Sequence, residues 1–186
     1  MKVLVACEFS GIVRDAFKNK GHNAWSCDFL DSEKPGQHIK GNVKNIINEN
    51  WDLMIAHPPC TYLAVSGARW FKYRIQEQEK ALEFVKELMN ANIPKIVIEN
   101  PISIISTKIR KPDQIIQPWQ FGHLEMKRTC LWLKNLPLLE PTADIKNINW
   151  NEVKERIYYE KPGPERWKNR SRFFPLIAKA MAEQWS

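Results

Sequence analysis

Three short, mostly apolar runs constrain the fold of this chain more than any other feature of its sequence. They are Val3–Ala6, Leu53–Ala56 and Lys95–Ile98. Apolar runs of this length, continuous rather than alternating, are typical of strands in a parallel sheet covered on both faces. Each run is therefore interpreted as a buried strand.

Segments with helical spacing separate these runs. Ser10 can cap a helix that carries Val13 and Phe17 on one face, and Gly21 stands where a left-handed residue would end it. Leu82, Val85, Leu88 and Met89 repeat at helical spacing within the range Gln76 to Asn90. Alternating strands and helices predict an α/β fold: a doubly wound, mostly parallel sheet with helices on both faces.

The remaining segments complete the predicted layout. A second strand is expected around Ala24–Ser26, ending at Asp28, and another over Thr129–Leu133. A closing helix is expected over Pro175–Gln184. At 186 residues the chain is expected to form one domain, 1–186, with an irregular region over residues 137–172.

Charge and cysteine spacing narrow the classes of partner and site. The net charge of +7 and the isoelectric point near 9.2 favour phosphate-bearing partners. The four cysteines lie far apart, with no Cys-x-x-Cys, so no metal site is expected and the thiols are expected to be reduced. No apolar stretch approaches the roughly 20 residues that cross a bilayer. A cytoplasmic location without a membrane partner is therefore expected.

Reactive side chains follow several of the predicted strands. Cys60 comes after Leu53–Ala56 and two prolines, Glu99 comes just after Lys95–Ile98, and Asp28 ends the second strand. Sheets of this type bind ligands at the carboxyl ends of their strands, so these three residues are expected at one edge of the sheet.

The same residues carry a resemblance to a known family. Phe9-Ser10-Gly11 followed by Arg14 to Phe17, Gly41-Asn42-Val43, Pro58-Pro59-Cys60 and Glu99-Asn100-Pro101 occur in the order and spacing of four family motifs. On these motifs the chain resembles the cytosine-C5 DNA methyltransferases, in particular their short relatives encoded by phages and prophages. The resemblance implies a Rossmann-like fold, S-adenosylmethionine as cofactor and, for a phage-encoded protein, the bacterial host cytoplasm.

The resemblance also implies roles for individual residues. Cys60 would add as a thiolate to C6 of cytosine, and Glu99 would act as general acid at the ring. Asp28 would hold the ribose hydroxyls of the cofactor. The other implied cofactor-binding residues are Phe9, Gly11, Asn42 and Pro58, and the implied substrate-binding residues are Asn100, Lys127 and Arg128. A base within a duplex would first have to be flipped out.

Several positions depart from the family pattern. Asn42 replaces an aspartate that would bond the adenine amine, and the glycine pair after Phe-x-Gly is absent. Glu125, Lys127 and Thr129 replace a glutamine and two arginines, and His57 replaces a glycine. Only a few dozen residues stand where full-length relatives carry a target-recognition domain. A separate specificity subunit or a homo-oligomer is a corresponding expectation.

Simpler interpretations stay open for these residues. An isolated cysteine is usually a small buried apolar residue, and Asp28 could be a surface turn residue. A basic, aromatic stretch around Trp167 could bind a phosphate backbone or could anchor the C-terminal arm, and Arg69, Trp70, Lys72 and Arg74 raise the same question.

Three functions remain. The first is methyl transfer to C5 of cytosine in DNA, the second is the same chemistry on a free cytidine nucleotide, and the third is a non-catalytic protein that binds nucleic acid or nucleotide. Retention of Cys60 together with Glu99 favours the first two, because a binding protein needs neither.

Overall fold

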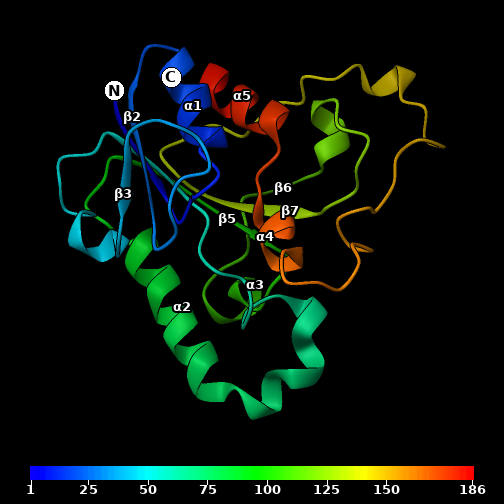
Figure 1. Cartoon of the computed structure of the whole chain (residues 1–186), viewed down its shortest axis with the longest axis horizontal. Helices are drawn as coiled ribbons and strands as arrows, with labels where there is room; N and C mark the ends of the chain where they lie inside the picture. Colours follow the sequence, from blue (N-terminus) through cyan, green and yellow to red (C-terminus); the bar gives the residue numbers. More distant parts are fainter.

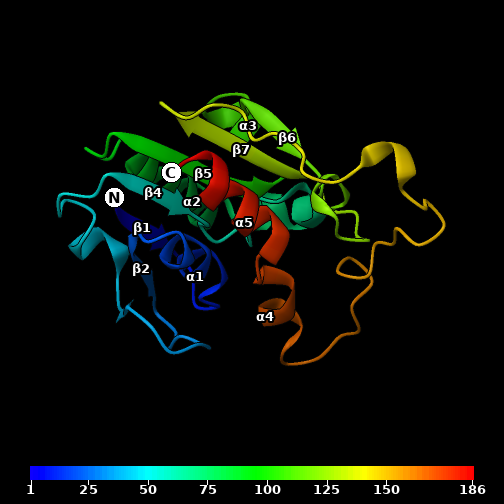
Figure 2. The ribbon, with the colours of Figure 1, turned by 90° about the horizontal axis from the view of Figure 1, so that it is seen from above.

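A seven-stranded sheet with helices on both faces forms the body of the protein in the computed structural model, which describes residues 1–186 (Figures 1 and 2). The strand order is β3-β2-β1-β4-β5-β7-β6. The strands are β1 (Lys2–Ala6), β2 (Asn23–Asp28), β3 (His38–Lys40), β4 (Leu53–Ala56), β5 (Lys95–Pro101), β6 (Gln114–Ile116) and β7 (Thr129–Lys134).

The helices connect and cover these strands. The α-helices are α1 (Ile12–Asn19), α2 (Ile75–Met89), α3 (Ile105–Lys108), α4 (Arg166–Ser171) and α5 (Pro175–Gln184). The 3₁₀ helices are η1 (Val43–Asn45), η2 (Val65–Tyr73), η3 (Pro118–Phe121) and η4 (Ile145–Asn147). Figures 1 and 2 both show α1 and α5 side by side, with α2 apart from them.

The sheet is mixed, so the expected doubly wound parallel arrangement is not confirmed. Strands β3, β2, β1, β4 and β5 run parallel to one another. Strand β7 pairs antiparallel with both β5 and β6. The chain turns back through η3 after β6, and β7 then inserts between β5 and β6 in the opposite direction.

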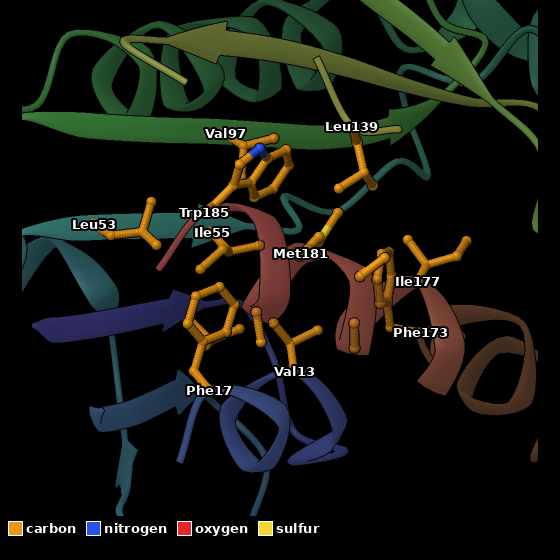
Figure 3. Close-up of a cluster of buried hydrophobic side chains, with 14 of the residues drawn as sticks. Val13, Phe17, Leu53, Ile55, Val97, Leu139, Phe173, Ile177, Met181 and Trp185 are labelled. Atoms are coloured by element: carbon orange, nitrogen blue, oxygen red, sulfur yellow. The ribbon is translucent and has the colours of Figure 1, made fainter. Parts of the chain in front are cut away.

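Alternate residues of the strands enter two separate cores. On one face Val3, Val5 and Ile55 pack against α1 and α5, where Phe17, Met181 and Trp185 fill the space between helix and sheet (Figure 3). On the other face Leu4, Met54 and Ile98 belong to the core that holds Val85 and Leu88 of α2. Burial on both faces explains why the strands read as continuous apolar runs.

Most predicted elements are confirmed, with differences at their ends. The left-handed conformation of Gly21, with a φ of 83°, closes α1 as expected. Strands β3 and β6 were missed because each has three residues. Glu99 does not follow the strand but lies within β5, since pairing with β7 continues to Pro101.

The expected cap of α1 is also corrected. The Ser10 hydroxyl accepts only a 3.3 Å bond from the amide of Ile12. The carboxylate of Glu8 instead accepts from the amides of Val13 and Arg14, at 2.7 and 3.2 Å. Glu8 is therefore the side chain that satisfies the free amides at the start of this helix.

Residues 135–165 contain η4 and otherwise no helix or strand, and Figures 1 and 2 show this segment extending away from the sheet before it returns at α4. Buried side chains hold it to the body at Leu139 and Val153. The carboxylate of Glu125 accepts from the amide of Ile157 at 3.0 Å. All four cysteines are free thiols. None of the helices has the length and apolar character needed to span a membrane.

Candidate active site

The strand order reverses between β1 and β4, and ligands of open α/β sheets bind outside the carboxyl ends of strands at such a point. The loop that holds His57 and Cys60 follows β4 directly, while Phe9 and Gly11 follow β1. Asp28 ends the neighbouring strand β2. The predicted site residues are thus carried by adjacent strand ends.

A short network holds the loop after β4. The side-chain amide of Asn100, on β5, donates to the carbonyl of Pro58 at 2.9 Å. The amides of Leu63 and Ala64 donate to the carbonyl of Cys60 at 3.0 and 2.9 Å. Because Pro58, Leu63 and Ala64 are all buried, the half-buried Cys60 sits in a turn fixed on both sides.

Glu99 forms a buried pair with His57. Its Oε2 lies 3.0 Å from Nδ1 of the imidazole, and both side chains are 11% exposed. Burial favours the neutral carboxyl, but the hydrogen bond and charge of His57, with the charge of Lys127, outweigh it and lower the pKa of Glu99. Glu99 is thus an ionised carboxylate here, whereas the role implied by the resemblance requires a proton.

The role implied for Cys60 requires a thiolate, whereas its surroundings favour the protonated thiol. Burial and the negative charge of Glu99 raise its pKa, although Lys127 and Arg170 act in the other direction. The surroundings of Cys60 therefore do not favour the thiolate that the resemblance implies. A thiolate would form more readily if the charge of Glu99 were neutralised.

Lys127 is held where its charge reaches both residues. Its Nζ donates to the carbonyl of Arg170 at 3.2 Å and lies 5.7 Å from the ring centroid of Phe174. The charge of Lys127 lowers the pKa values of both Cys60 and Glu99. Arg128 is exposed, and no ion pair or hydrogen bond of its side chain connects it to these groups.

Asp28, which the resemblance implies would hold the cofactor's ribose, is the last residue of β2. Its Oδ1 accepts from the amide of Leu30 at 2.9 Å. Burial raises its pKa despite that bond and the charge of His38. Beside it, Cys7 has a φ of 60°, and burial with the charge of Asp28 raises the pKa of its thiol to about 12. A carboxylate with one oxygen bonded locally can still accept from hydroxyl groups of a ligand.

The turn between β1 and α1 is filled by the protein's own side chains. Gly11, with a φ of 69°, packs against the guanidinium of Arg14, which a Cβ at position 11 would approach to 2.5 Å. The fully buried Arg14 donates to Ser26, Ser32 and the carbonyls of Lys34 and Pro35. Because Glu8 occupies the start of α1, that helix end is not available to an anion.

Helix α4 covers the other side of this turn. The ring of Trp167 lies 6.4 Å from that of Phe9, and Nζ of Lys168 lies 5.6 Å from the Phe9 centroid. Arg172 donates to both carboxylate oxygens of Glu33, at 2.9 and 2.7 Å. These contacts favour the anchoring interpretation of the basic, aromatic stretch. Helix α4 also carries Arg170, whose charge lowers the pKa of the Cys60 thiol.

Asn42 is engaged in local structure. Its Oδ1 accepts from the amide of Lys44 at 3.0 Å and so caps η1. Its side-chain nitrogen makes no hydrogen bond within the chain, and the residue is partly exposed at the turn after β3. Bonding to an adenine amine would require the oxygen that η1 now uses.

The contacts of three residues that shape the site could not be predicted from the sequence, although His57 was noted as a departure from the family pattern and Arg14 as part of a motif. His57 had no visible partner because Glu99 is 42 positions away. Glu8 and Arg14 bind groups on other segments, so spacing gives no sign of them. One signal in the sequence could have indicated their contact: Glu8 and Arg14 flank Phe9-Ser10-Gly11, at a turn that lacks the glycine pair of the family.

Comparisons with known proteins add little. No protein-family model matches the chain, and no curated protein matches it. Among solved structures, it is similar to a candidate DNA modification methyltransferase encoded within an E. coli prophage, with 14% identity and a TM-score of 0.46. The match covers 75% of this chain and 50% of the neighbour, so the chain spans about half of that protein's length.

Proposed function

We propose that this protein transfers a methyl group from S-adenosylmethionine to C5 of a cytosine in nucleic acid, with Cys60 as nucleophile. One observation supports the proposal: a 2.9 Å bond from Asn100 to the carbonyl of Pro58 joins the loop of Cys60 to β5 beside Glu99, and the charges of Glu99 and Lys127 act in opposite directions on the pKa of the thiol. A thiol, a carboxylate and a cation at one strand edge suit a reaction in which a ring is attacked and polarised at once.

The residues at the end of β2 suit the ribose of the cofactor, whereas the start of α1 differs from what the resemblance implies. Asp28, half-buried at the end of β2, has a carboxylate that can accept from ribose hydroxyls in addition to the amide of Leu30. Glu8 is buried with both carboxylate oxygens bonded within the chain, and it excludes a ligand carboxylate from the start of α1. The cofactor would supply an electrophilic methyl on a sulfonium sulfur.

The chain's own groups would act on the base. The Cys60 thiol would give its proton to solvent, and its sulfur would add to C6, so that the ring electrons become available at C5. After C5 gains the methyl group, it would give its own proton to solvent as the C6–S bond breaks and the thiolate leaves. Glu99 would hold the exocyclic amine and the N3 edge, with His57 supplying the proton that an ionised carboxylate lacks.

The test is transfer of labelled methyl groups. Protein and methyl-labelled S-adenosylmethionine are incubated with duplex DNA, single-stranded DNA, RNA or cytidine nucleotides. Label is expected in a polymer and is expected to disappear with Cys60→Ala and Cys60→Ser, while Thr61→Ala, an exposed neighbour on the same loop, retains it. Label only in nucleotides would replace the polymer by a free substrate. Binding without label in any substrate would overturn the catalytic proposal.

A further inference from the structure

A cationic and aromatic surface follows Cys60 along the chain. We call it the η2 surface, and its members are Tyr62, Arg69, Trp70, Lys72, Tyr73 and Arg74. No acidic residue occurs from Leu53 to Gln76. The segment therefore carries positive charge without local compensation, directly after the proposed nucleophile.

The rings and cations of the η2 surface alternate in contact. The guanidinium of Arg69 lies 5.2 Å from the Trp70 ring centroid, and Nζ of Lys72 lies 4.8 Å from that of Tyr73. Arg74 lies 5.6 Å from the ring of Tyr62. The rings of Trp70 and Tyr73 are tilted to each other with centroids 6.5 Å apart. Each cation is thus placed by a ring and not by a carboxylate.

These side chains are available to a partner. The exposed fractions of Trp70 and Tyr73 are 48% and 68%. None of the nine ion pairs of the molecule involves Arg69, Lys72 or Arg74. A binding surface is indicated when large exposed rings lie beside cations that have no ion-pair partner.

Backbone bonds join this surface to the candidate active site. The amide of Val65 donates to the carbonyl of Ile102, and that of Ile104 donates to the carbonyl of Leu63, both at 3.0 Å. The η2 segment is therefore attached on one side to the turn of Cys60 and on the other to the chain that leaves Glu99. Figure 1 shows η2 and the start of α2 projecting from the body of the protein.

We propose that the η2 surface binds the backbone and unstacked bases of a single-stranded nucleic acid. Positive charges attract phosphates, and exposed rings stack on bases of any sequence, which is the combination found in single-strand binding proteins. A duplex would leave the rings without partners, because its bases are already stacked. The inference rests on the proposed function in one respect, because it identifies the polymer that would present cytosine to Cys60.

The test measures binding separately from methyl transfer. Fluorescence anisotropy of labelled 12-residue oligonucleotides is followed without cofactor, using single-stranded DNA, single-stranded RNA and duplex DNA. Single strands are expected to bind at least tenfold more tightly than the duplex. Trp70→Ala with Tyr73→Ala is expected to weaken single-strand binding by about tenfold or more, since each stacked base contributes strongly. The control Tyr159→Ala removes an exposed ring elsewhere and should change nothing.

Salt dependence and a comparison with methyl transfer complete the design. Replacing Arg69, Lys72 and Arg74 by glutamine should reduce the slope of log affinity against log salt by about 0.7 for each phosphate that the variant no longer neutralises. Tight binding of single strands by the wild type without methyl transfer to any substrate would contradict only the proposed function. Equal or tighter duplex binding, or no effect of the ring variants on single-strand binding, would overturn the inference.

Discussion

Nδ1 of His57 lies 3.0 Å from Oε2 of Glu99, and this contact decides the charge state of the candidate active site. It keeps a buried carboxylate ionised, and burial together with the charge of that carboxylate raises the pKa of the neighbouring Cys60 thiol. Nε2 of the same imidazole is buried without a hydrogen-bond partner. The pair therefore holds both a charge and an unused nitrogen next to the proposed nucleophile.

Removing the imidazole should destabilise the fold in a pH-dependent way. His57→Ala leaves the Glu99 carboxylate buried without its partner, which costs about 1–3 kcal/mol of unfolding free energy near neutral pH. In the wild type the pKa of Glu99 is lowered, so its contribution is present above the ordinary value of 4.5 and is lost as the pH falls through the folded pKa.

In His57→Ala, burial is opposed only by the charge of Lys127 and is expected to raise the pKa of Glu99, so the carboxylate takes up a proton at higher pH. The difference between wild type and variant should therefore be largest near pH 7 and should shrink towards pH 4. Urea unfolding across that range measures it. A constant difference would show that the loss is one of packing against Phe173.

The reactivity of Cys60 should report the charges around it. Glu99→Gln removes the negative charge that raises the pKa of the thiol, so alkylation by iodoacetamide at pH 8 should be several-fold faster. Lys127→Met should slow it, because Lys127 lowers that pKa. Peptide mass spectrometry separates Cys60 from Cys7, whose pKa is raised to about 12. Equal rates in the three proteins would contradict the electrostatic account.

The turn before α1 should not tolerate a side chain at Gly11. An added Cβ would lie 2.5 Å from the buried guanidinium of Arg14, which is held by several hydrogen bonds. Gly11→Ala should therefore cost more than the roughly 1–2 kcal/mol of a left-handed alanine. Gly21→Ala is the control, since its φ is also positive but nothing lies within 4 Å of the added atom. Thermal unfolding measures both variants, and similar losses of unfolding free energy would contradict the close packing of Gly11 against Arg14.

Binding of the cofactor should depend on Asp28. Asp28→Asn removes the charge and one acceptor at the end of β2 while keeping the shape, and the affinity for S-adenosylmethionine should fall by about tenfold, near the loss of one hydrogen bond to a charged group. Asp31→Asn, an exposed neighbour, serves as the control. Calorimetric titration measures these affinities. The same affinity for Asp28→Asn and Asp31→Asn would show that Asp28 does not bind the cofactor.

The elements that the sequence predicted are those whose signal is local. Apolar runs indicated β1, β4 and β5 because burial on both faces leaves no alternation to misinterpret. Strand β6 was missed because it has three residues, and the antiparallel direction of β7 was missed because direction depends on the path of the chain through η3.

In the site too, features with a local signal could be predicted and features that depend on distant segments could not. Cys60 and Asp28 could be placed at strand ends from order alone, and Glu99 was expected just past the strand that in fact contains it, but the charge states of the three could not be predicted. Those depend on His57, on Lys127 held against Arg170, and on burial, all of which involve segments distant in sequence. The anchoring of α4 on Phe9 and Glu33 is likewise a contact between the two ends of the chain.

The most direct test of the central claim is covalent capture of Cys60. An oligonucleotide with 5-fluorocytosine cannot lose fluorine as a cation from C5, so an adduct formed during methyl transfer would persist. With S-adenosylmethionine present, the protein mass is predicted to rise by that of the methylated oligonucleotide, with the bond on Cys60 and none formed by Cys60→Ser. An oligonucleotide that binds yet leaves Cys60 unmodified, or an adduct on another residue, would contradict the account.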